Sequence, residues 1–271
     1  MNVIFQMTHN KVTGSVIDAL EYFMVANLTS PVYLVLLDIP HYSIQDYKQH
    51  LLYLINNRYN YPYDLSDKIK IVPKIELIKQ EFDEVVILDW GTITHIHGLL
   101  RAKHITIVTE LTDSTHVMLD KSKYNVTYFT EMPFAYCDEK YIMKFAFEFF
   151  KPLSNVKEAL YLNCPGDIDN LNANNYAASF NKPYFVKQEQ HVNNLFEQFD
   201  EYVYYHSAYF DPHPRLFHEC YFYKKRINYI NNAKVKDGSY YRFSDLVVNK
   251  LTNRYLDSND EIIRILGGKD G

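Results

Sequence analysis

The sequence contains few cysteines, glycines and prolines, and it has no long apolar run. Among 271 residues there are 8 glycines and 10 prolines, which excludes collagen-like and low-complexity chains. The longest apolar run covers residues 31–37, far short of the roughly 20 residues that a membrane-spanning helix needs. The first ten residues lack a basic segment followed by a long apolar one, so we expect no signal peptide and no stable membrane association.

The three cysteines are too few and too scattered for a disulfide framework or a zinc site. Cys137, Cys164 and Cys220 form no CxxC pair and no Cys/His spacing typical of zinc. An odd number of distant cysteines is typical of a reducing compartment, so we expect a cytoplasmic protein.

The remaining composition is that of a folded globular protein. Apolar residues make up 47% and charged residues 23%, which excludes wholesale disorder. The formal charge is −5, so the chain is not basic overall, although a local basic groove is compatible with it. The 25 tyrosines and 17 phenylalanines stand beside a single tryptophan. Because a tyrosine ring packs while its hydroxyl stays in water, this excess suits wide, half-buried clefts.

Apolar runs that predict strands alternate with segments of helical spacing along most of the chain. In the first half the predicted strands are Asn2–Met7, Val32–Asp38, Ile69–Pro73, 84–89, 104–109 and 126–129. Helical spacing occupies 16–26, 44–56, 97–102 and 139–150. The strands are continuous apolar runs, as expected for a parallel sheet with helices on both faces.

A connector, KPLSN at 151–155, separates this half from a second one with the same alternation. Its predicted strands are 159–162, 184–187, 202–205 and 227–229, and its predicted helices are 172–179, 193–199, 214–223 and 244–256. We therefore expect an α/β fold of two Rossmann-like parallel-sheet domains, 1–152 and 153–271. Open α/β sheets bind ligands beyond the carboxyl ends of their strands, so two facing halves predict a cleft between them.

The common nucleotide and hydrolase motifs are missing. No GxGxxG, GxxxxGK[ST], HExxH or GxSxG occurs. Their absence disfavours a classical dinucleotide dehydrogenase, a P-loop enzyme, a zincin and an α/β-hydrolase.

The most informative segment is DPHPRLFHECYFYKKRINYIN, residues 211–231. Arg215 lies in the first turn of a predicted helix, and Glu219 follows one turn later on the same face. A helix N-terminus binds anions, an Arg beside it can bind a diphosphate, and a Glu one turn on can accept hydrogen bonds from a ribose diol. The alternative is an exposed Arg–Glu pair that contributes roughly 0.3 kcal/mol.

This strand, Pro-Arg-x-x-x-Glu helix and strand resemble the donor-binding helix of GT-B glycosyltransferases. The resemblance implies that Glu219 binds the ribose of a nucleotide diphosphate sugar, for which UDP is the expected nucleotide. Arg215 is then the residue expected to bind the diphosphate. His206 follows a predicted strand and His213 lies at the predicted helix start, so we expect either of them to contact a phosphate or the sugar.

The first half resembles, within that family, the phage glucosyltransferases that modify hydroxymethylated cytosine in DNA. EVVILDWGTITHIHGLL (84–100) and KHITIVTELTDST (103–115) are similar to their strand, loop, helix, strand and Thr-acid sequence. In those enzymes a carboxylate just after this strand deprotonates the acceptor hydroxyl. The resemblance implies that Glu110 is this base, with Asp113 close behind, and that double-stranded DNA is the acceptor, in the host cytoplasm if a phage encodes the chain.

Two features depart from the family pattern. The loop NCPGDIDN (163–170) has no basic residue where the family brings Arg to the diphosphate, and no Gly-rich loop follows the first strand. Arg215, Lys187 or the KKR at 224–226 must then supply the positive charge.

Other residues are candidates for the acceptor side. Asp89 ends a predicted strand, where it holds the acceptor or caps the following turn. His95 is expected to line the cleft. His95 and His97 have no third metal ligand at a sensible spacing, so Mg²⁺ or Mn²⁺ is compatible with the sequence but not required by it.

A short C-terminal window concentrates basic residues that either follow a phosphate backbone or form a solvated face: Lys224, Lys225, Arg226, Lys234, Lys236 and Arg242. Two other functions stay open. One is a GT-B enzyme of surface-polysaccharide assembly, although residues 44–56 lack the basic, membrane-facing helix of such enzymes. The other is a non-enzymatic nucleotide-binding module.

Overall fold

The chain folds into two compact units, which are divided in sequence between Phe149 and Phe150. A computed structural model describes residues 1–7, 14–38, 44–88, 90–96, 98–108, 119–130, 139–140, 146–163, 175, 178–179, 182–186, 195–206 and 215–231. The predicted domains, 1–152 and 153–271, extend over residues outside these ranges and stay a prediction. No helix in the described ranges is long and apolar enough to cross a membrane.

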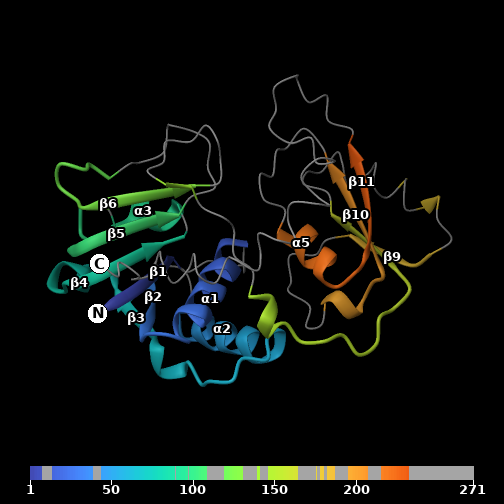
Figure 1. Cartoon of the computed structure of the whole chain (residues 1–271), viewed down its shortest axis with the longest axis horizontal. Coiled ribbons are helices and arrows are strands. Elements are labelled where there is room, and N and C mark those ends of the chain that lie inside the picture. The colour runs from blue at the N-terminus through green and yellow to red at the C-terminus, as the bar shows by residue number, and fades with distance from the viewer. Residues whose placement is uncertain are drawn as a thin grey trace. The chain divides into compact units, whose positions relative to one another are not determined.

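The first unit contains a seven-stranded sheet in which every pairing is parallel (Figure 1). Its strands are β1 (Asn2–Met7), β2 (Val32–Asp38), β3 (Ile69–Pro73), β4 (Phe82–Ile87), β5 (Ala102–Val108), β6 (Val126–Thr130) and the two-residue β7 (Glu139–Lys140). The order is β3-β2-β1-β4-β5-β6-β7, so the direction of winding reverses between β1 and β4. This order is Rossmann-like, and it confirms the predicted parallel α/β class.

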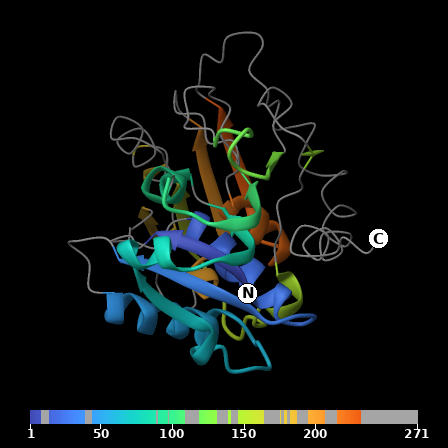
Figure 2. The same ribbon diagram turned by 90° about the vertical axis from the view of Figure 1, so that its left-hand side faces the viewer.

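Helices cover both faces of this sheet. α1 (Gly14–Ala26) and α2 (Ile44–Arg58) lie on one side, and α3 (Trp90–Ile96) lies on the other (Figures 1 and 2). Short 3-10 turns occupy Ser66–Lys68, Lys74–Lys79 and Phe147–Phe149. All residues of α1 from 16 to 26 are buried, which explains its almost uninterrupted apolar sequence.

The core under α3 is built by alternate residues of the strands. Phe5 of β1, Ile87 of β4 and Ile107 of β5 point to this face, where Ile93 and Ile96 of α3 pack against them. The cluster contains sixteen buried side chains, so the face is dry and apolar. Parallel strands need a crossover connection, usually a helix, and here the crossover helix α3 covers this face of the sheet.

The second unit contains a smaller parallel sheet. Its strands are β8 (Leu160–Asn163), β9 (Tyr184–Val186), β10 (Glu201–His206) and β11 (Arg226–Asn231), in the order β11-β10-β8-β9. The winding reverses between β8 and β10. α5 (Arg215–Phe222) contacts β10 and β11, and a 3-10 turn occupies Leu195–Glu197.

Tyrosines form much of the core of this second unit. Tyr161 and Tyr202 are paired neighbours on β8 and β10. The Tyr161 ring stacks on the Phe199 ring at a centroid distance of 5.0 Å and on the Tyr202 ring at 5.9 Å. Leu216 and Cys220 of α5 pack against this face. The many tyrosines of the sequence therefore serve packing here.

Three predicted helices are wrong in the described residues. Residues 97–102 were predicted helical, but α3 ends at Ile96, Gly98 adopts a left-handed φ of 79°, and Ala102 begins β5. A glycine in this conformation ends a helix because a Cβ is disfavoured there. Of residues 139–150, Glu139–Lys140 form β7 and Phe147–Phe149 a 3-10 turn. Of 193–199, only Leu195–Glu197 are helical, again as a 3-10 turn.

Candidate functional site

Each sheet has one topological switch point, and ligands of open α/β sheets bind beyond the carboxyl ends of the strands there. In the first sheet these ends are Met7 of β1 and Ile87 of β4. In the second sheet they are Asn163 of β8 and His206 of β10. Each unit therefore has its own candidate site.

Several of the predicted site residues lie close to the carboxyl end of a strand in the sequence. Asp89 comes two residues after β4, Glu110 two residues after β5, and His213 two residues before α5. These three residues and Asp113 lie outside the described residues. His206 is the last residue of β10, so its backbone lies at the switch point of the second sheet.

α5 carries the predicted donor residues Arg215 and Glu219. The helix joins β10 to the parallel strand β11, so its first residue, Arg215, lies toward the carboxyl ends of the strands. Leu216, Cys220 and Tyr223 form the stripe that packs on the sheet. Glu219 shares this stripe by its spacing, and it is only 2% exposed.

Glu219 is buried and is not a surface residue of α5. Its carboxylate lies close enough to the sheet to affect neighbouring groups. Burial raises the pKa of the Tyr161 phenol, and the nearby carboxylate of Glu219 raises it further. Burial also raises the pKa of the Cys220 thiol, with a second contribution from Glu219, so this cysteine is an uncharged core residue.

The basic run at 224–226 is not available to a ligand at the carboxyl ends. Buried Lys225 donates hydrogen bonds to the carbonyls of Phe196 and Phe199, the latter at 2.7 Å. Arg226 forms ion pairs with Asp200 at 2.7 Å and Glu201 at 3.3 Å.

Both basic residues also lie at the amino end of β11, a six-residue strand about 20 Å long. Lys225 and Arg226 are therefore too far from the carboxyl ends of the strands to contact a diphosphate bound there. Lys187, Lys234, Lys236 and Arg242 lie outside the described residues. Arg215 is thus the basic candidate that the described topology brings to the switch point.

His95 lies in the last turn of α3 and is half-buried. α3 runs from the carboxyl end of β4 toward the amino end of β5. His95 is about 8 Å along the helix from its first residue, so its backbone lies away from the carboxyl end of β4. The described residues contain no group of three His, Cys, Asp or Glu side chains arranged as metal ligands.

A hydrogen-bonded polar row crosses three strands of the first sheet, and sequence reasoning did not identify it. His104 Nδ1 lies 2.7 Å from Glu84 Oε1, and His104 Nε2 lies 2.9 Å from Thr127 Oγ1. Thr106 donates to the same Glu84 oxygen at 2.9 Å. The signal was present in β5, where His104 and Thr106 alternate with isoleucines, but the pairing of Glu84 with His104 requires the register of the strands.

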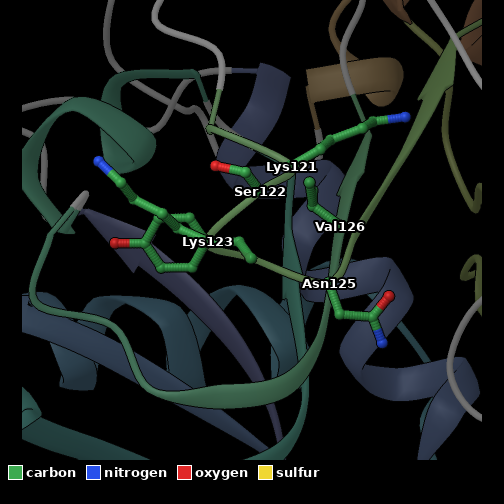
Figure 3. Close-up of a pocket in the computed structure, with 6 residues that line it drawn as sticks. Lys121, Ser122, Lys123, Asn125 and Val126 are labelled. Atoms are coloured by element: carbon green, nitrogen blue, oxygen red, sulfur yellow. The ribbon is translucent and has the colours of Figure 1, made fainter.

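A shallow hollow of about 370 Å³ lies at the amino end of β6 (Figure 3). It is lined by Lys121, Ser122, Lys123, Tyr124, Asn125 and Val126. In Figure 3 the ammonium groups of Lys121 and Lys123 point away from one another, so they do not converge on one ligand. The hollow is also at the edge opposite to the switch point, which disfavours it as a nucleotide site.

Comparison of the chain with models of known families, with curated proteins and with solved structures finds no match.

Proposed function

We propose that the protein is a glycosyltransferase that uses a nucleotide diphosphate sugar, held in the second unit at the carboxyl ends of β8 and β10. The observation that carries this proposal is the place of α5 in the topology. This helix follows β10, the first strand beyond the switch point, and it presents Arg215 at its start and Glu219 one turn later.

The chemistry of these groups matches the parts of a nucleotide sugar. Unpaired backbone N–H groups and the helix dipole favour an anion at the start of α5, and a guanidinium can bind two phosphate oxygens at once. A carboxylate accepts two hydrogen bonds from vicinal ribose hydroxyls. Because Glu219 is buried, a ribose reaches it only by displacing the groups that cover it, so an affinity measurement also tests access.

The acceptor belongs to the first unit in this proposal. Glu110 removes the proton of the acceptor hydroxyl, with Asp89 and His95 as acceptor contacts. The freed oxygen attacks the anomeric carbon, the bond from that carbon to the diphosphate breaks, and the nucleoside diphosphate leaves. Arg215 and the start of α5 stabilise the negative charge that develops on the leaving group.

The proposed acceptor is hydroxymethylated cytosine in double-stranded DNA, on the resemblance of residues 84–115. The target base must be flipped out of the duplex to reach a general base. A divalent cation is compatible with this proposal but not required by it.

Nucleotide binding is the first test. The melting temperature of the protein is measured with UDP, GDP and inorganic pyrophosphate, since a ligand at 100 times its Kd stabilises by about 2.7 kcal/mol. We expect a rise with one nucleoside diphosphate and its loss in Arg215→Gln. Lys224→Gln, at the other end of α5, is the matched control and keeps the rise. No stabilisation by any nucleotide sugar or nucleoside diphosphate would contradict the proposal.

A further inference from the structure

We draw no further inference here: the strongest candidate, the row of Glu84, His104 and Thr127 across β4, β5 and β6, has the hydrogen bonds of an acid–histidine–hydroxyl relay, but it lies on the middle of a sheet face and nothing in the described part of the chain shows what covers it or how a substrate reaches it.

Discussion

At the scale of single residues, Glu219 is the most informative position. It is a carboxylate on the buried stripe of α5, where an apolar side chain packs without cost. If it accepts hydrogen bonds from a ribose, those bonds are charge-assisted and each contributes roughly 1.5–3 kcal/mol.

We expect Glu219→Gln to lower the affinity for the nucleoside diphosphate at least about tenfold, which corresponds to about 1.4 kcal/mol. Calorimetric titration measures this change. Inorganic pyrophosphate is the control ligand, since it has no ribose, and its affinity should not change. An unchanged nucleotide affinity would remove Glu219 from the site and leave it as a packing residue.

His104 is the second residue whose contribution can be measured, here as a contribution to the stability of the fold. Glu84 and His104 are each 17% exposed, so their hydrogen bond is only partly screened by water. Replacing His104 with Phe removes one hydrogen-bond partner of the Glu84 carboxylate and leaves Thr106 as another. We expect this change to lower the free energy of unfolding by about 2 kcal/mol in urea titrations.

The matched control for His104 is Thr127→Val, which removes only the neutral end of the same row. We expect it to cost about 1 kcal/mol. An equal or larger loss in Thr127→Val would show that the Glu84–His104 hydrogen bond is not the dominant interaction of the row.

At the scale of secondary structure elements, the turn that follows α5 holds Lys224 in a left-handed backbone conformation, which residues other than glycine disfavour. Lys224 has a φ of 55°, and the Lys225 amide donates to the Cys220 carbonyl at 2.9 Å to close the helix. In this left-handed conformation a residue with a Cβ is less stable than glycine by about 1–2 kcal/mol. A glycine avoids this cost, but it also loses more conformational entropy on folding, which offsets part of the gain.

Lys224→Gly should therefore raise the stability of the second unit by up to about 1 kcal/mol. Thermal unfolding measures it, with Lys224→Ala as the control that keeps the Cβ and gains nothing. A loss of stability in the glycine variant would mean that the Lys224 side chain itself contributes to the fold.

The elements show which parts of the structure the sequence predicts well. β1, β2 and β3 match their predicted bounds. β1 and β2 lie inside the sheet and are nearly continuous apolar runs, as expected for strands covered on both faces, whereas the edge strand β3 is mostly exposed or half-buried. Residues 139–150 are also apolar, but aromatic runs fit several backbone conformations, and only tertiary contacts select β7 and the 3-10 turn.

The candidate site was less predictable for a physical reason. Sequence spacing places Arg215 and Glu219 on one helix, but whether a side chain is buried depends on the sheet beneath it. The topology likewise determines where Lys225 and Arg226 lie. They follow α5 closely in the sequence but lie at the amino end of β11, opposite to the carboxyl ends where a ligand is expected. The residue types therefore indicate which ligand groups the side chains can bind, whereas the strand order determines at which edge of the sheet they lie.

At the scale of the whole molecule, the charge of −5 limits how DNA can bind. A duplex is attracted only by local basic groups, so its affinity should be modest and should fall steeply between about 50 and 200 mM salt. Binding that does not depend on salt would argue against a DNA acceptor, whereas transfer to a glycan would favour the polysaccharide enzyme.

The decisive variant for the proposed reaction is Glu110→Gln. A general base contributes roughly 10²–10⁴-fold to the rate, so this variant should lose most transfer onto hydroxymethylated DNA while it still binds the nucleotide sugar. Transfer is measured as labelled sugar on DNA, and donor binding by calorimetry. Asp113→Asn is the matched control, and we expect it to retain most of the rate. If instead Glu110→Gln is fully active and Asp113→Asn is not, the base is Asp113 and not Glu110, since the two carboxylates follow the same strand in the sequence.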